Sequence, residues 1–269
     1  MIFRKETTDA AQMILMMKMI QLTIWVRMKI LTTKTILSKI AIIITAAGSS
    51  TRIGGGIKKE YLPFKNGTVL SVCAQAFLNA CADYEITDFI VTCPVGGVEA
   101  CRAALDGVDC HAPSALAMTE GVRIVEGSDT RQKSVYNGLL AVNGQPDIVL
   151  IHDGARPFVS RQVIMDALQA ACEYGASVPG VTPTDTQKEI DANGFIKRHL
   201  VRSSLTAVQT PQCFRFKELL EAHGRAVADG HEYTDDTEIW GAYCGPVRVT
   251  KGDVNNIKIT YPSDLEALK

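Results

Sequence analysis

The most regular feature of the chain is an alternation of apolar runs with amphipathic stretches that begins at Lys39. Residues 40–44 form a continuous, mostly β-branched run, which is typical of a strand buried on both faces of a sheet. The alternation predicts strands at 86–93, 122–125, 147–152, 176–181 and 246–250, and helices at 69–81, 97–105, 128–142, 160–173, 215–229, 234–241 and from 262. This pattern indicates an α/β fold with a mostly parallel, Rossmann-like sheet that is covered by helices on both faces.

One segment, residues 182–205, interrupts the alternation. Two short, half-polar runs flank the tight-turn sequence Asp191-Ala192-Asn193-Gly194 and contain too few apolar residues for central strands. We expect a projecting β-hairpin arm that packs against a second copy of the chain, which makes the protein a homodimer. A solvated surface hairpin is the alternative.

Residues 1–39 differ from the rest, because they contain six of the eight methionines and neither glycine nor proline. Their apolar stretch, residues 11–26, is shorter than the roughly 20 residues that a membrane-spanning helix needs. The acidic Glu6 and Asp9 do not suit a signal peptide. We expect a poorly ordered or mis-assigned extension, with Met28 as the true start, ahead of one domain at 40–269. An amphipathic helix that rests on a membrane or a partner is the alternative.

The charge balance limits the classes of partner. Because 28 basic residues face 29 acidic ones, the net charge of −1 argues against binding of nucleic acid through its phosphates. The eight cysteines form no CxxC pair and are scattered through apolar stretches, as reduced thiols would be. We therefore expect a cytoplasmic protein without a membrane anchor.

The loop after the first strand is the first candidate for chemistry. It consists of small residues at 46–51, then Arg52, three glycines at 54–56 and a second cation at Lys59. Small residues let backbone N–H groups approach phosphate oxygens, and the two cations bracket the loop. It matches neither a Walker A loop nor a GxGxxG fingerprint. We predict a phosphate-binding loop; a flexible surface loop is the alternative.

Asp153 ends the strand predicted at 147–152, at the edge of the sheet where the phosphate-binding loop is expected. A carboxylate beside a polyphosphate suits Mg²⁺, either directly or through water. Capping of the next turn, or a pair with Arg156, is the alternative. Strand alternation turns His152 to the other face, so we interpret it as a core residue.

Several segments together resemble the 2-C-methyl-D-erythritol 4-phosphate cytidylyltransferases, the CTP-using enzymes of the non-mevalonate isoprenoid pathway. The resemblance covers about residues 40–268 in order. It rests on Ala46-Ala47-Gly48-x3-Arg52-x6-Lys59-Glu60-Tyr61-Leu62, Gly127-Ser128-Asp129-Thr130-Arg131-Gln132-x-Ser134-Val135, His152-Asp153-Gly154-Ala155-Arg156-Pro157, Asp185-Thr186-x-Lys188, Thr210-Pro211-Gln212-x-Phe214 and Asn256-Ile257-Lys258-Ile259-Thr260.

The resemblance implies a nucleotide-diphospho-sugar transferase-like fold and a reaction that joins CMP from CTP to 2-C-methyl-D-erythritol 4-phosphate with release of pyrophosphate. It also implies a divalent cation, Mg²⁺. The residues that it assigns are Arg52 and Lys59 at the α-phosphate, Ala46, Ala47, Gly48, Ser128, Asp129 and Ser134 around cytosine and ribose, Asp153 near ribose and metal, Arg156 at the sugar phosphate, Thr186 and Arg202 from the partner's arm, and Lys258 at the second substrate.

The chain departs from the family pattern where Lys58, Glu60, Ser128 and Asn255 replace the usual proline, glutamine, glycine and acid, and where Pro183 lies one residue closer to Asp185 than expected. The adjacent lysines leave the register uncertain by one residue, and Lys59 is preferred because Glu60-Tyr61-Leu62 follows it. Two other functions stay open: the same transfer to ribitol 5-phosphate, and a catalytically inactive nucleotide-binding dimer.

Overall fold

The structure, a computed structural model, describes residues 38–50, 52–53, 56, 58–108 and 121–268. Residues 1–37 of the extension predicted at 1–39, and with them the start expected at Met28, lie outside the described residues. A unit that begins at Ser38 contains all the elements below.

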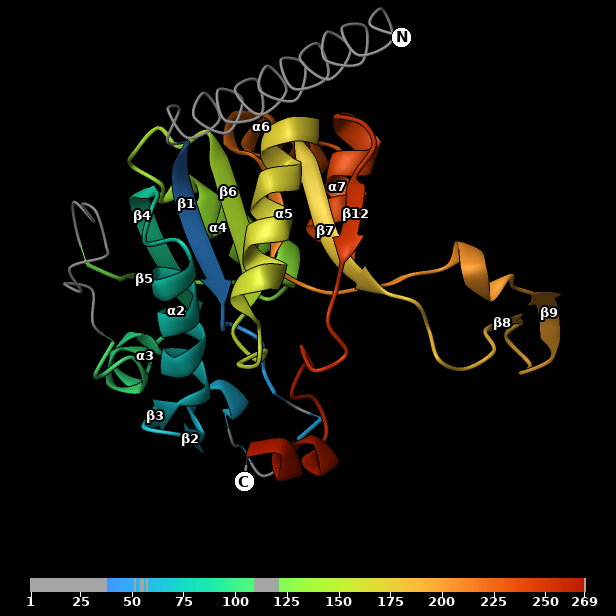
Figure 1. Cartoon of the computed structure of the whole chain (residues 1–269), viewed down its shortest axis with the longest axis horizontal. Helices are drawn as coiled ribbons and strands as arrows, with labels where there is room; N and C mark the ends of the chain where they lie inside the picture. The colour runs from blue at the N-terminus through green and yellow to red at the C-terminus, as the bar shows by residue number, and fades with distance from the viewer. Residues whose placement is uncertain (1–37, 51, 54–55, 57, 109–120, 269) are drawn as a thin grey trace, which may run out of the picture. The chain divides into compact units, whose positions relative to one another are not determined.

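An eight-stranded sheet lies at the centre of this unit, with strand order β10-β7-β11-β6-β1-β4-β5 and β12 paired to β7 (Figure 1). The strands are β1 (Lys39–Thr45), β4 (Glu85–Cys93), β5 (Arg123–Glu126), β6 (Ile148–Asp153), β7 (Ala176–Val181), β10 (Ala207–Val208), β11 (Gln212–Arg215) and β12 (Arg248–Lys251). β5, β4, β1 and β6 are mutually parallel, and β12 is parallel to β7. β10 and β11 are antiparallel to their neighbours. The predicted, mostly parallel α/β fold is confirmed.

Helices cover both faces of the sheet, as predicted. They are α2 (Val69–Ala80), α3 (Val98–Ala104), α4 (Arg131–Leu140), α5 (Arg161–Tyr174), α6 (Phe216–Ala228) and α7 (Asp236–Tyr243). Alternate residues of β1 enter two separate cores: Ile42 and Ile44 pack with α2, α3 and α5, and Ile43 packs with α4, α6 and α7. This double burial explains why β1 is a continuous apolar run, since each buried isoleucine contributes about 1.5–3 kcal/mol.

Local signals set the ends of the helices that frame the site. Thr68 and Ser71 form a capping box at the start of α2. Thr130 accepts a hydrogen bond from the backbone N–H of Lys133 and so begins α4. Gly175, at a φ of 90°, ends α5 in the left-handed conformation that glycine adopts without strain.

Smaller elements connect these units. A hairpin of β2 (Pro63–Phe64) and β3 (Gly67–Thr68) leads into α2, after a short 3-10 helix, η1 (Lys59–Tyr61). Two further 3-10 helices are η2 (Arg202–Ser204) and η3 (Pro262–Leu268). No helix in the described part of the chain is long and apolar enough to cross a membrane.

The predicted hairpin is present as β8 (Lys188–Ile190) and β9 (Ile196–His199), which pair only with each other in the described sheets. Figure 1 shows it set apart from the central sheet. Phe195, Ile190 and Val201 are exposed by 72%, 62% and 67%. Its association with a second copy stays a prediction.

Candidate active site

A cavity of about 410 Å³ lies at the carboxyl ends of β1, β5 and β6, where the loops of a parallel sheet converge. Its described lining is polar and charged. It consists of Thr45, Ala47, Gly48, Ser49, Ser50, Arg52, Lys59, Glu60, Ser128, Asp129, Thr130, Arg131, Ser134, Asp153, Ala155, Lys258 and Thr260.

Close approach of two loops shapes one wall of the cavity. A Cβ atom on Gly127 would lie 2.4 Å from the Cβ of Ala47 and 2.7 Å from Oγ of Ser134. Ser134 Oγ in turn accepts a hydrogen bond from the backbone N–H of Ser128 at 2.9 Å. Only glycine fits at position 127, and its absent side chain lets the loops after β1 and β5 meet.

Asp153 is the electrostatic centre of the site. Its carboxylate lies 2.8 Å from Lys258 Nζ, 3.6 Å from Arg156 Nε and 3.8 Å from Arg131 Nε. Thr45, its register partner on β1, donates a hydrogen bond to it at 3.4 Å. Burial alone would raise the pKa of Asp153, but Lys258 and the two arginines outweigh burial and hold the pKa far below its usual range. The group as a whole is positively charged, which suits a phosphate.

His152 is fully buried against Phe77, as predicted for a core histidine. Its Nε2 lies 3.2 Å from the carbonyl oxygen of Arg156, and its Nδ1 lies 2.9 Å from Thr210 Oγ1. The carbonyl can only accept, so Nε2 carries the proton and Nδ1 accepts from Thr210. Burial lowers the pKa of His152 to about 4, so the ring is neutral and holds the Asp153 strand end in place.

Lys59 lines the cavity, whereas its neighbour Lys58 does not. Lys58 Nζ instead lies 3.3 Å from the Glu60 carboxylate and donates to the carbonyl oxygen of Gly48. Lys59 is only 8% exposed and forms no ion pair within 4.0 Å with a described residue. Burial lowers the pKa of its ammonium group, and the Glu60 charge acts in the opposite direction. The geometry therefore places Lys59, and not Lys58, at the cavity.

Arg52 is exposed at the mouth of the cavity, with its guanidinium 5.8 Å from the ring centroid of Tyr261. Such an arrangement holds the cation near the site without neutralising it. Arg52 and Lys59 thus bracket the loop after β1, as the sequence predicts.

The predicted nucleotide-binding residues Ala47, Gly48, Ser128, Asp129 and Ser134 all line the cavity. Ser128 to Thr130 precede α4, so the positive end of that helix faces the site. Asp129 is paired with Lys133 at 2.9 Å.

Four predicted residues do not line the cavity. Ala46 is buried in the core beneath it. Arg156 lies behind Asp153, where its Nη1 donates to the carbonyl oxygen of Asn256 at 2.7 Å. Thr186 and Arg202 are exposed on the arm, and Arg202 Nη1 donates to Thr184 O at 2.8 Å. Within one copy of the chain, the arm is therefore not part of the site.

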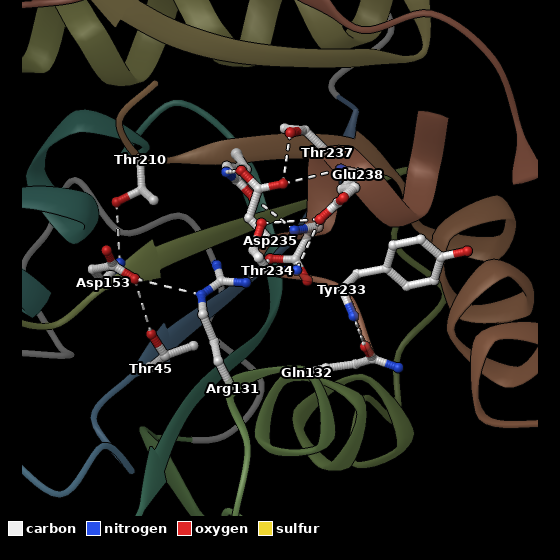
Figure 2. Close-up of polar contacts among 12 residues, drawn as sticks. Thr45, Arg131, Gln132, Asp153, Thr210, Tyr233, Thr234, Asp235, Thr237 and Glu238 are labelled. Atoms are coloured by element: carbon white, nitrogen blue, oxygen red, sulfur yellow. Dashed lines mark hydrogen bonds and ion pairs between the residues drawn. The ribbon is translucent and has the colours of Figure 1, made fainter. Parts of the chain in front are cut away.

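Arg131 lines the cavity, although sequence reasoning assigned it no role. Figure 2 shows its guanidinium directed toward Asp153. A signal was available, because a cation in the first turn of a helix opposes the helix dipole and so indicates that another interaction stabilises it there.

The described side chains do not form a resident magnesium site. The Asp153 carboxylate is already surrounded by cations, and Glu60 is paired with Lys58. Within the described ranges no three His, Cys, Asp or Glu residues are placed to hold a metal ion together. A cation-rich lining fits phosphate oxygens instead.

Comparisons with known proteins show which family the chain resembles. The family model for 2-C-methyl-D-erythritol 4-phosphate cytidylyltransferase matches residues 40–268. A protein of that name from Clostridium novyi is 38% identical over 229 residues, which is 85% of this chain and 94% of the relative.

Two solved structures share the fold. The 4-diphosphocytidyl-2C-methyl-D-erythritol synthase of Anaerococcus prevotii has a TM-score of 0.70 at 29% identity, covering 86% of this chain and 96% of its own. The 2-C-methyl-D-erythritol 4-phosphate cytidylyltransferase of Thermus thermophilus has a TM-score of 0.64 at 30% identity, covering 86% and 97%. The family model and the identity with these relatives show that this chain belongs to the 2-C-methyl-D-erythritol 4-phosphate cytidylyltransferase family.

Proposed function

We propose that the protein transfers CMP from CTP to 2-C-methyl-D-erythritol 4-phosphate, giving 4-diphosphocytidyl-2-C-methyl-D-erythritol and pyrophosphate. The observation that carries this proposal is Lys59, a residue that is only 8% exposed, lines the cavity and has no described carboxylate partner within 4.0 Å. A buried, unpaired charge is costly, and a bound anionic ligand removes that cost. The α-phosphate of CTP is the ligand that fits, since Arg52 brackets the same loop.

In this reaction a phosphate oxygen of the sugar-alcohol phosphate forms a bond to the α-phosphorus of CTP. The bond between that phosphorus and the bridging oxygen to the β-phosphate breaks, and pyrophosphate leaves with its electron pair. The attacking phosphate is already an anion near pH 7, since its second pKa is about 6. No general base is needed, and the described cavity lining contains neither histidine nor cysteine.

The chain's own residues then serve to place two anions against each other. Lys59 and Arg52 stabilise the negative charge that develops at the α-phosphorus, and Lys258 orients the second phosphate. Arg156 acts on that phosphate only through Asp153, whose carboxylate lies 3.6 Å from Arg156 Nε and 2.8 Å from Lys258 Nζ. The loops at 47–48 and 128–134 contact cytosine and ribose. We expect Mg²⁺ to arrive with the triphosphate as part of the substrate, because the protein ligands do not suit a resident ion.

Pyrophosphate release tests the proposal, with CTP and Mg²⁺ present and the acceptor varied. Release with methylerythritol 4-phosphate alone is the expected result. Release with ribitol 5-phosphate alone would instead assign the protein to the alternative acceptor. Absence of release with either, alongside measurable CTP binding, would support the inactive nucleotide-binding dimer. ATP in place of CTP measures base preference in the same assay.

We further propose that the arm at 182–205 completes the site of a second copy. The arm exposes apolar side chains that pack against nothing described, and it holds Thr186 and Arg202 away from the cavity of its own chain. Both facts are accounted for if the arms are exchanged across a two-fold axis.

Subunit complementation tests this exchange. Lys59→Ala and Arg202→Ala subunits are each expected to be inactive. Mixed after unfolding and refolding, they should regain about a quarter of wild-type activity, because half the dimers are mixed and each has one intact site. No recovery in a mixture shown to contain mixed dimers would contradict exchange of the arm.

A cytoplasmic location rests on cysteine usage and stays a prediction.

A further inference from the structure

A buried chain of charges extends from the site into the protein behind it. Arg131 Nε lies 3.8 Å from the Asp153 carboxylate, and Arg131 Nη1 lies 2.8 Å from Oδ2 of Asp236. Asp236 is fully buried and lies in the first turn of α7, far from Asp153 in the sequence. One guanidinium therefore bridges the Asp153 carboxylate, which lines the cavity, and the Asp236 carboxylate, which does not.

Asp236 is itself held from two directions. Nε2 of His223, a fully buried residue of α6, lies 3.1 Å from its Oδ1. The backbone N–H of Asp236 donates to Oε1 of Gln212 at 3.2 Å, and Gln212 Nε2 donates to the neighbouring Asp235. Tyr136 of α4 stacks on the His223 ring at 8° between planes, which fixes the ring's orientation. Asp236 is therefore a rigid anchor.

A second contact joins the same two segments. Gln132, the residue after Arg131, donates to His231 O at 3.1 Å and accepts from the backbone N–H of Tyr233 at 2.8 Å. Figure 2 shows Gln132 with Tyr233, and Arg131 extending from the same helix end toward Asp153. Two hydrogen bonds thus join the start of α4 to the segment that leads into α7.

We propose that Asp236, oriented by His223, is a positioning residue that holds the Arg131 guanidinium where it can contact the triphosphate of CTP. This proposal rests on the proposed function and adds to it residues outside the cavity. The Arg131 side chain is 26% exposed and lines the cavity, whereas that of Asp236 is 0% exposed. A fully buried carboxylate therefore holds a cation that a ligand in the cavity can reach.

The competing carboxylates explain why an anchor is needed. Without Asp236, the Arg131 guanidinium would turn to pair fully with Asp153, which is its other neighbour. That pair would consume a cation of the site and displace Lys258, which lies 2.8 Å from the same carboxylate. Asp236 holds Arg131 at 3.8 Å from Asp153 and leaves the guanidinium available to a ligand phosphate.

Asp236→Asn distinguishes a positioning role from an effect of net charge, because the two predict opposite changes in the KM for CTP. Removal of a negative charge near the site makes the field more favourable to CTP, so a role through net charge predicts a lower KM for CTP. A positioning role predicts the opposite, a KM for CTP raised roughly ten-fold or more, because the lost orientation outweighs the gained field. The measurement is pyrophosphate release at saturating acceptor with CTP varied.

Companion variants separate position from packing. Asp236→Glu keeps the carboxylate, so its KM for CTP should lie close to that of wild type. His223→Gln keeps an N–H donor toward Asp236 and should resemble wild type, whereas His223→Leu should raise the KM for CTP several-fold.

Asp88→Asn is the matched control. Asp88 is also buried, pairs with Arg123, and lies near the start of β4, away from the cavity. Its loss should lower the free energy of unfolding while the KM for CTP stays within two-fold of wild type.

A KM for CTP in folded Asp236→Asn that is unchanged or lower overturns the proposal. So does a His223→Leu variant with wild-type KM, which decides the question if Asp236→Asn does not fold. If wild type releases no pyrophosphate, the proposed function fails on its own. The affinities of wild type and the variants for CTP are then compared by thermal shift, as the CTP concentration that gives half of the maximal shift. Failure of the proposed function is thus distinguishable from failure of the positioning role.

Discussion

Replacement of Lys59 by methionine should change activity and stability in opposite directions. The change keeps the length of the side chain and removes its charge. Lys59 is 8% exposed, lines the cavity, and has no described ion-pair partner within 4.0 Å. By analogy with loss of one preorganised donor at an anionic transition state, about 2.7–4 kcal/mol of stabilisation is lost, so kcat should fall by roughly two to three decades.

The free protein should become more stable. Because burial lowers the pKa of Lys59, the charged form is less favourable in the folded chain than in the unfolded chain at neutral pH. Single stabilising substitutions commonly raise the free energy of unfolding by about 0.5–2 kcal/mol, so a gain of that order is expected. Urea titrations without CTP measure that gain, and CTP should stabilise wild type more than the variant.

Lys58→Met is the matched control, since the two lysines are adjacent. Its removal leaves the Glu60 carboxylate, 3% exposed, without its ion-pair partner at 3.3 Å, so stability should fall. The reasoning is refuted if Lys59→Met retains turnover within three-fold of wild type, or if both variants lose stability alike.

Three further predictions follow from other parts of the structure. Since the pKa of His152 falls from 6.5 unfolded to about 4 folded, the unfolded chain binds the extra proton as pH falls through this window. Wild type should therefore lose about 3 kcal/mol of unfolding free energy between pH 7 and pH 4, and His152→Gln, compared by urea titration, should lose less. Gly127→Ala would place a Cβ 2.4 Å from that of Ala47, and should cost about 1–3 kcal/mol and raise the KM for CTP; Gly241→Ala, with no atom within 4 Å, should do neither. Phe195→Ser removes the most exposed aromatic side chain of the arm, so light scattering should show a weaker dimer, and an unchanged dimer constant would argue against packing of Phe195 between copies.

The sequence by itself was enough to predict the elements whose burial follows from a local pattern of apolar and polar residues. The run at 40–44 is apolar at every position because both faces of β1 are covered, and the arm is recognisable by its polar strands and tight turn. The loop cations Arg52 and Lys59 follow a buried strand, so their place at the carboxyl edge of the sheet was predictable.

Elements that depend on distant partners were not predictable. β11 (Gln212–Arg215) has a polar first residue and no long apolar run, yet it lies between β6 and β7. Gln212 is tolerated there because its amide is satisfied by Asp235 and Asp236, which come more than twenty residues later. No local pattern encodes such a partner.

The site divides in the same way. Local motifs identified most of the residues that line the cavity, and they favoured Lys59 over Lys58 only through the residues that follow, whereas the fold separates the two by their contacts. Three different helices carry Arg131, Asp236 and His223, and the role of these residues can be inferred only from their contacts in the fold. Burial makes those contacts specific, since a charge removed from water is stable only where the fold supplies a partner, and the fold alone decides which partner that is.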